Sequence, residues 1–185
     1  MVTGNHDQYV LALATGEDPG LKGEELEHQR WIAERLDHRF VPLLADLPWS
    51  LRVTHQGKQL LLQHYHLTGG GFAPVDRAPS LAKLEALYHD DPADAVCFGH
   101  HHVVHHFQSG TRLYVNPGAL GCCDRPVARY GLLHTAGPEV RVELREAAYD
   151  NGAFLASYER LGVPARSFIL KAFHGNQHTR SRDDA

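Results

Sequence analysis

The residues of this chain best suited to metal chemistry are histidines and an asparagine at three separate places. Neutral imidazole nitrogens and amide oxygens are good ligands for Zn, Mn and Fe. Each place follows a segment that reads as the end of a strand, and open α/β sheets place ligand sites beyond the C-terminal ends of their strands. The sequence therefore predicts one metal site that draws on all three places. The candidate residues are Asn5, His6, His64, His100 and His102.

The histidine cluster in the middle of the chain has a spacing suited to metal ligands. Residues 94–98 predict a short buried strand, and Gly99 leads from it into His100 and His102. Side chains two residues apart in an extended chain point the same way, so both imidazoles can face one metal cluster. The competing interpretation is a surface turn that happens to be rich in histidine. The glycine, the spacing and the apolar strand favour the metal role.

The other two places each leave an alternative open. The apolar run at residues 60–62 is typical of a strand buried on both faces, and it delivers His64 and His66 at its end. We favour His64 as the ligand because it comes first after the run, and we take His66 as a candidate substrate contact. Asn5 could instead form a tight Gly-Asn bend, and His6 could be a capping or solvent-facing residue.

The period of the hydrophobic pattern predicts the elements that hold these residues. Apolar residues at helical spacing predict helices, and a change to continuous or alternating apolar runs after Pro48 predicts strands. Gln56-Gly57 predicts a hairpin turn, and the stretch 67–79, rich in Gly and Pro, predicts a long loop. The expected helices are 8–14, 23–36, 38–44, 81–88 and 151–161; the expected strands are 1–3, 49–54, 58–63, 94–98, 105–108, 112–115, 128–135 and 139–145.

Length, charge and cysteine content limit the class of protein. A chain of 185 residues is one ordinary domain, which we place at residues 1–173, with a polar, mobile tail at residues 174–185. The net charge of -4 gives no bulk attraction to nucleic acid or anionic membrane. No apolar run approaches the ~18 residues of a membrane span. Three cysteines, two of them adjacent, do not read as a disulfide framework, so we predict a cytoplasmic protein.

Taken in order, these motifs resemble the calcineurin-like metallophosphoesterases, particularly their small bacterial phosphodiesterase and phosphatase branch. The pattern of that family is D-x-H, then G-D, then G-N-H-[D/E], then H, then G-H-x-H. This chain shows Gly4-Asn5-His6-Asp7, then His64, then Gly99-His100-His101-His102, and Asn116-Pro117-Gly118 resembles the turn that follows in these enzymes. The resemblance implies an α/β fold, a two-sheet β-sandwich flanked by helices.

The resemblance also implies a ligand set for two divalent ions. Asn5, His64 and His100 would ligate one ion, and His102 would ligate the other. The ions would be Mn, Zn or Fe, and they would hold a bridging hydroxide that attacks a phosphomonoester or phosphodiester in line. The partner would be a small phosphorylated substrate, with nucleotide-like molecules among the candidates. The resemblance assigns no substrate-binding residue.

The resemblance implies a different role for the histidine next to Asn5. His6 would not be a ligand. It would face the leaving group, where it stabilises charge or donates a proton, and Asp7 would orient its ring.

The first two motifs of the family, D-x-H and G-D, would lie before Gly4, where this sequence has only three residues. We therefore expect an N-terminally truncated domain, either because translation starts further upstream or because the gene is shortened. The alternative to an active phosphoesterase is then a non-catalytic remnant, or a metal-binding protein that a partner chain completes.

Overall fold

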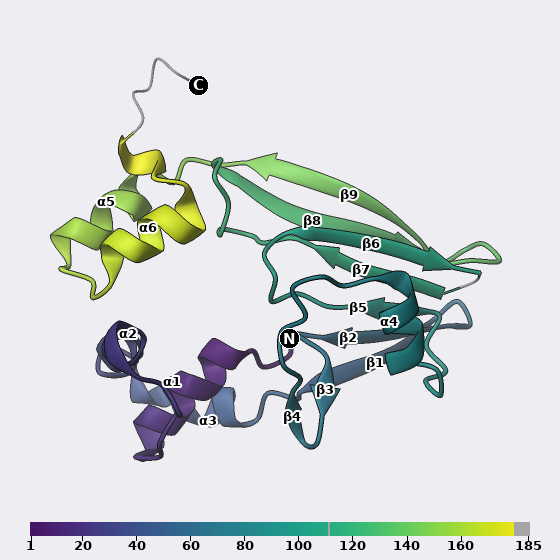
Figure 1. Ribbon diagram of the computed structural model, residues 1–185, viewed down its shortest axis with the longest axis horizontal. Coiled ribbons are helices and arrows are strands. Elements are labelled where there is room, and N and C mark those ends of the chain that lie inside the picture. Colours follow the sequence, from purple (N-terminus) through teal and green to yellow (C-terminus); the bar gives the residue numbers. More distant parts are fainter. Residues whose placement is uncertain (111, 180–185) are drawn as a thin grey trace. The chain divides into compact units, whose positions relative to one another are not determined.

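The computed structural model describes residues 1–110 and 112–179 of the chain, and the chain divides into two compact units (Figure 1). The first unit contains Met1–Asn5, Leu47–Ala119 and Arg129–Arg145. The second takes residues 6–46, 120–128 and the chain from residue 146 onward.

A five-stranded sheet is the centre of the first unit. Its strand order is β1-β2-β5-β7-β6, and β2, β5 and β7 run parallel to one another. The outer strands β1 and β6 are antiparallel to their neighbours, as Figure 1 shows. The bounds of the strands are Ser50–His55 for β1, Lys58–Gln63 for β2, Ala95–Cys97 for β5, Val104–Ser109 for β6 and Arg112–Pro117 for β7.

Turn chemistry sets the register at the edge of this sheet. Gln56 and Gly57 both have positive φ, 50° and 78°, as the central residues of a type I′ hairpin turn require. The turn pairs His55 with Lys58, and the register then runs back to Ser50 and Gln63. The predicted hairpin is confirmed, and the central strands lie within a residue or two of their predicted bounds.

Each face of the five-stranded sheet is covered by a different element. Side chains alternate along a strand, so neighbouring residues of one strand serve opposite faces. Leu61, Val96 and Tyr114 pack with Leu84 and Tyr88 from the helix α4 (Leu81–Leu87) and its end. On the other face, Leu60, Ala95, Leu113 and Val115 form a cluster with Val140, next to Leu133 and Val142.

Leu133 and Val142 lie in a two-stranded sheet, β8 (Val127–His134) and β9 (Arg141–Ala148), and Val140 directly precedes β9. The result is two packed sheets with a helix on the outer face, so the predicted fold class is confirmed. The predicted cap of α4 is also present, since the Ser80 hydroxyl accepts a hydrogen bond from the Lys83 N–H.

Two predicted features of the first unit are wrong. The stretch 67–79 is not a plain loop, because β3 (Leu67–Thr68) and β4 (Gly71–Phe72) pair across it as a small hairpin. Residues 1–3 are not a strand. The buried Thr3 donates one backbone hydrogen bond to Pro48, and no described strand pairs with this segment.

The second unit is helical. An aspartate caps its first 3₁₀ turn, because the Asp37 carboxylate accepts the Arg39 N–H. The sequence did not predict α6, which follows Ala165 in a left-handed conformation with no side-chain cap. The predicted tail begins inside this helix, and residues 180–185 of that tail lie outside the described residues. The elements are α1 (Asn5–Thr15), α2 (Gly23–Ala33), η1 (His38–Phe40), α3 (Val41–Ala45), α5 (Gly152–Arg160), α6 (Arg166–His174) and η2 (Gln177–Thr179).

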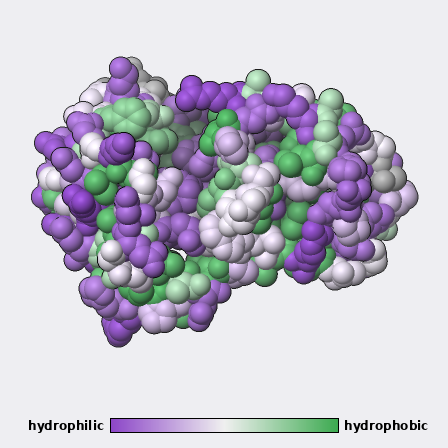
Figure 2. All heavy atoms as spheres, turned by 60° about the horizontal axis from the view of Figure 1, so that its bottom comes forward, coloured by the Kyte–Doolittle hydropathy of each residue, from purple (hydrophilic) through white to green (hydrophobic). Residues whose placement is uncertain are grey.

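The exposed surface is mixed in character. Figure 2 shows hydrophobic residues scattered among hydrophilic ones on the face in view. Within the residues that the structure describes, no helix is long and apolar enough to cross a bilayer.

The core of the sheet gives a first test of the fold. Leu113 is fully buried between the two sheets, and Leu113→Ala should lower the free energy of unfolding by about 2–5 kcal/mol because it leaves a cavity. Leu120, which is 72% exposed, is the matched control, and Leu120→Ala should change stability by less than about 0.5 kcal/mol. Urea unfolding followed by circular dichroism measures both. Equal losses in the two variants would contradict the packing described here.

Candidate metal centre

The three parallel strands of the sheet end at one edge, and a polar residue lies at or just after the end of each strand. His64 comes directly after β2, and Gly99 and His100 follow β5. Asn116 lies at the end of β7. The sheet pairing continues past these ends, since the Gly99 N–H donates to the His64 carbonyl at 2.8 Å and the Phe98 N–H donates to Val115 at 2.9 Å. The ligand-bearing segments are therefore held in one register.

Three of the predicted site residues converge at this edge. The His64 Nε2 atom lies 2.9 Å from Asn5 Oδ1 and 3.2 Å from His100 Nδ1. The His100 Nδ1 atom lies 3.1 Å from Asn5 Oδ1. All three residues belong to the first unit, and all three are partly buried. We call this group the Asn5–His64–His100 triangle.

Hydrogen bonds alone cannot satisfy the triangle. Asn5 Oδ1 can only accept, and each neutral imidazole nitrogen either carries one proton or carries none. If both nitrogens donate to the amide oxygen, two N–H groups face each other at 3.2 Å. If only one nitrogen donates, the unprotonated nitrogen and the amide oxygen are two acceptors that lie 2.9 or 3.1 Å apart. A cation among the three atoms would remove this conflict, because all three could then direct lone pairs at it.

The spacing of the triangle also fits a transition-metal ion. Adjacent ligands of an octahedral ion with bonds of about 2.1 Å lie about 3.0 Å apart. The three donor pairs lie between 2.9 and 3.2 Å apart. Two imidazoles and an amide oxygen are moreover a donor set typical of Mn, Zn or Fe sites.

The close approach of the His64 ring explains the glycine at position 4. A Cβ atom at Gly4 would lie only 3.1 Å from the His64 Nδ1 atom, whereas one at Gly99 would make an ordinary contact of 3.4 Å with the His64 carbonyl oxygen. A larger residue at Gly4 would push the His64 ring out of its place. Glycine there is thus a condition for the triangle.

The turn after Gly99 is not extended, so the expected alternation of His100 and His102 is wrong. Both residues have left-handed backbone, with φ of 69° and 59°, which costs a non-glycine residue about 1 kcal/mol or more. Buried Asn116 braces this turn. Its Nδ2 donates to the Gly99 carbonyl and its Oδ1 accepts the Gly118 N–H, both at 2.9 Å.

Comparison with known proteins identifies the family of this chain. Residues 1–137 match the family described as the calcineurin-like phosphoesterase superfamily domain, about three quarters of the chain. The chain belongs to that superfamily. No protein with a curated description matches the chain at a significant level.

Two solved structures share the fold of this phosphoesterase domain. One is a hypothetical protein from Pyrococcus horikoshii OT3, 16% identical, with a TM-score of 0.75 over 94% of this chain and 72% of that one. The other is a metallophosphoesterase from Sphaerobacter thermophilus, 18% identical, with a TM-score of 0.69 over 94% of this chain and 76% of that one. At these identities the likeness concerns the fold alone.

The other predicted site residues are His102, His6 and Asp7. His102 is partly buried. His6 lies in the second unit, where its Nδ1 atom is 2.7 Å from the Nε2 of the fully buried Gln29. The structure thus gives Gln29 as a contact of the His6 ring, and the orienting role of Asp7 stays a prediction. Within the described residues, no three His, Cys, Asp or Glu side chains gather as a metal-binding group.

His66, the alternative to His64, is buried beneath the site. It is 5% exposed, and its Nδ1 atom lies 2.7 Å from the hydroxyl of Tyr88, which also accepts a hydrogen bond from Gln63. This leaves the His66 ring little surface for a substrate. The burial of His66 has no signal in the sequence, because the two histidines follow the same apolar run.

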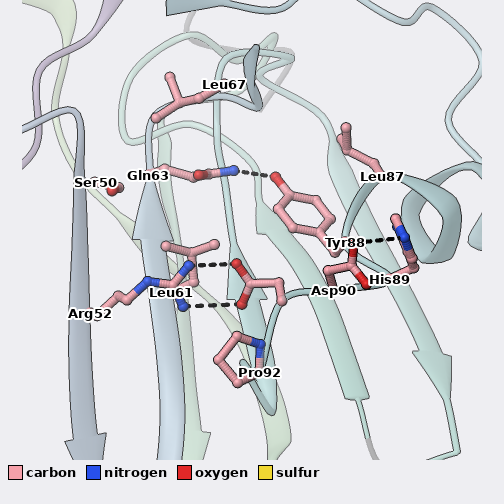
Figure 3. Close-up of a pocket in the computed structure, with 11 residues that line it drawn as sticks. Ser50, Arg52, Leu61, Gln63, Leu67, Leu87, Tyr88, His89, Asp90 and Pro92 are labelled. Atoms are coloured by element: carbon pink, nitrogen blue, oxygen red, sulfur yellow. Dashed lines mark hydrogen bonds and ion pairs between the residues drawn. The ribbon is translucent and has the colours of Figure 1, made fainter. Parts of the chain in front are cut away.

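A separate pocket of about 450 Å³ lies on the α4 side of the sheet (Figure 3). Its charged groups are already paired with one another. Arg52 contacts the Asp91 carboxylate through both terminal nitrogens, and His89 lies 2.8 Å from Asp90. The pocket is bordered by Gln63, which precedes His64, but it contains no member of the triangle.

The burial of His66 gives a pH-dependence of stability. Burial lowers the pKa of His66 from 6.5 to about 4, because the charged ring would lose its hydration. The unfolded chain then binds the proton more readily, so this stabilisation is complete above about pH 6.5 and is lost as the pH falls towards 4. The loss should be on the order of 3 kcal/mol.

Urea unfolding between pH 7.5 and pH 4.5, in the presence of a chelator, measures this loss. His66→Gln should show a shallower decline, and the difference between the two curves isolates His66 from the other buried histidines. Curves of equal slope would contradict the assignment.

Proposed function

We propose that this protein hydrolyses phosphate esters with the help of divalent metal ions bound at the Asn5–His64–His100 triangle. The observation that carries the proposal is the convergence of three ligand atoms within 2.9–3.2 Å at the C-terminal edge of the parallel strands. Membership in the calcineurin-like phosphoesterase superfamily supports the reaction class.

The chain's residues divide into two ligand groups in this proposal. Asn5, His64 and His100 hold the first ion, and His102 contributes to a second ion. Ions at these places supply Lewis acidity, which activates water and neutralises charge on the phosphoryl oxygens. The three ligands of the triangle are neutral, so they leave the charge of the first ion available to an anionic substrate. The same neutrality lowers its affinity for the protein relative to a site with a carboxylate.

His6 acts on the leaving group in this proposal. Support comes from its position next to Asn5 in the chain and from its exposed side chain. The contact of Nδ1 with the Gln29 amide leaves Nε2 as the ring nitrogen for proton donation. Asp7 assists by orienting the ring or by favouring its charged form.

The substrate that we propose is a small phosphorylated molecule, with nucleotide-like esters among the candidates. The acidic net charge of -4 supports a small substrate over a nucleic acid. All three cysteines are free thiols, as a reducing compartment requires, and we propose that the protein acts in the cytoplasm.

A second candidate function is a protein that binds one metal ion without catalysis. It is favoured by the finding that, in the described part of the chain, no group of three His, Cys, Asp or Glu side chains forms a metal site. The number of bound ions separates the two candidates.

Metal titration tests the ligand assignment. We expect the wild-type protein to bind two Mn²⁺ ions per chain in calorimetry. His100→Ala should weaken Mn²⁺ binding at the triangle at least tenfold, because it removes one of three identified ligands, and His102→Ala should leave a single binding event. His89→Ala is the matched control, since that ring is exposed and its described partners are the Asp90 carboxylate and the Ala86 carbonyl.

The outcomes are distinct. Binding of one ion by the wild type, unaffected by His102→Ala, would favour the non-catalytic candidate. Equal affinities of the wild type and His100→Ala would remove the triangle as the binding site.

A comparison of two leaving groups tests the proposed role of His6 in proton donation. His6→Ala should lower kcat for an aryl phosphodiester by about 100-fold when phenol leaves, because phenoxide needs a proton. The loss should be much smaller for p-nitrophenol, which leaves readily as an anion, and Mn²⁺ content should not change. A loss that is equal for both leaving groups would contradict proton donation by His6.

A further inference from the structure

Tyr65 occupies the centre of the histidine cluster beneath the triangle, although nothing in the sequence distinguishes it. The residue lies between His64 and His66 and is 1% exposed. Its ring centroid is 4.9 Å from that of His100 and 5.2 Å from that of His101. A phenylalanine would meet these packing demands, so the hydroxyl needs a separate explanation.

The hydroxyl joins two segments that are far apart in the sequence. The Asp76 N–H donates to Tyr65 Oη at 2.9 Å, and His101 Nε2 lies 3.0 Å from the same oxygen. Because Oη already accepts from Asp76, we assign its proton to the bond with His101 Nε2. Burial raises the pKa of Tyr65, which keeps that proton in place.

Both segments are restrained by contacts with other parts of the chain, and Lys83 already holds the segment 73–79 through the Asp76 carboxylate and the Ala78 carbonyl. The turn at residues 99–102 carries two non-glycine residues with positive φ, and one of them is the triangle ligand His100. The segment 73–79 has exposed side chains at Val75 and Arg77. One hydroxyl therefore restrains both the turn that carries a ligand and an exposed segment linked to it.

We propose that Tyr65 is a positioning residue that couples the segment 73–79 to the His100–His101 turn through its hydroxyl. The metal-dependent half of this inference rests on the proposed function, whereas the coupling itself does not. Through this link, order in the segment 73–79 and metal binding at the triangle reinforce each other, since a coupling between two sites is reciprocal. The conformation of the segment 73–79 is thereby assigned a dependence on metal binding at the triangle.

Limited proteolysis measures the coupling directly. Trypsin can cut after Arg77, which is exposed within the segment, and cleavage after the exposed Arg160 in the second unit serves as an internal reference. Tyr65→Phe keeps the ring and removes the hydroxyl, so cleavage after Arg77 should be at least tenfold faster relative to the reference. Tyr114→Phe is the matched control, because Tyr114 is equally buried and its hydroxyl lies 3.4 Å from Arg112, away from the segment.

A double-mutant cycle separates coupling from a general loosening. His101→Ala should also speed cleavage after Arg77, and the double variant should be no faster than Tyr65→Phe, because both changes break the same link. Independent, additive effects would overturn the coupling, as would wild-type cleavage in Tyr65→Phe.

Added Mn²⁺ completes the test. It should slow cleavage after Arg77 several-fold in the wild type and have no effect in Tyr65→Phe, whose Mn²⁺ affinity should fall three- to tenfold in calorimetry. Protection by Mn²⁺ that is the same in both proteins would overturn the metal-dependent half of the proposal. A wild type that binds no Mn²⁺ would overturn both that half and the proposed function, whereas the cycle in the absence of metal would still decide the coupling.

Discussion

The hydrogen bond from the Gly99 N–H to the His64 carbonyl is the link on which the candidate site depends. It extends the pairing of β2 and β5 beyond the last residues of both strands, and it measures 2.8 Å. Parallel pairing fixes the relative register of two strands that are separated by a crossover in the sequence. The bond therefore places His100 against His64, although 36 positions separate them. Without this bond β2 and β5 would still pair, but their pairing alone would not hold the His64 and His100 rings next to each other.

This arrangement concentrates local strain at the point where the chemistry is proposed. His100 and His102 have left-handed backbone, a conformation that persists in such residues only where the surroundings enforce it. Buried Asn116 supplies one restraint by bonding to the Gly99 carbonyl, and Tyr65 supplies another through His101. The donors of the triangle then face one another in a way that hydrogen bonds cannot satisfy. Restraint of the backbone and conflict among the donors are both expected of a site that is shaped for a cation.

The sequence was sufficient to predict the parts of the fold that have strong local signals. The central strands follow short apolar runs, and Gln56-Gly57 marks the tight hairpin turn between β1 and β2. The convergence of Asn5, His64 and His100 was predictable for the same reason, because each motif stands directly after such a run or beside a glycine. Their order along the chain, compared with a known family, supplied the ligand set.

The features that the sequence missed depend on tertiary contacts. The β3–β4 hairpin has strands of two residues each, too short for any periodicity. The helix α6 starts after a left-handed Ala165 instead of a capping residue, so no start signal was present. His66 and Tyr65 are sequence neighbours of a predicted ligand. Tyr88, at the end of α4, contacts the His66 ring, and the segment 73–79 contacts the Tyr65 hydroxyl, so both arrangements depend on tertiary packing.

The supports of the triangle differ in kind, and that difference bears on what the site can do. Gly4 acts by allowing the His64 ring to approach the backbone closely, which is a fixed feature of the folded chain. Asn116 acts through two hydrogen bonds to backbone groups on either side of it, which makes a rigid brace. The Tyr65 hydroxyl instead links the ligand turn to the segment 73–79, which Lys83 and the His66 carbonyl also hold. A site built in this way combines a fixed set of ligand atoms with one linked segment whose order depends on several polar contacts.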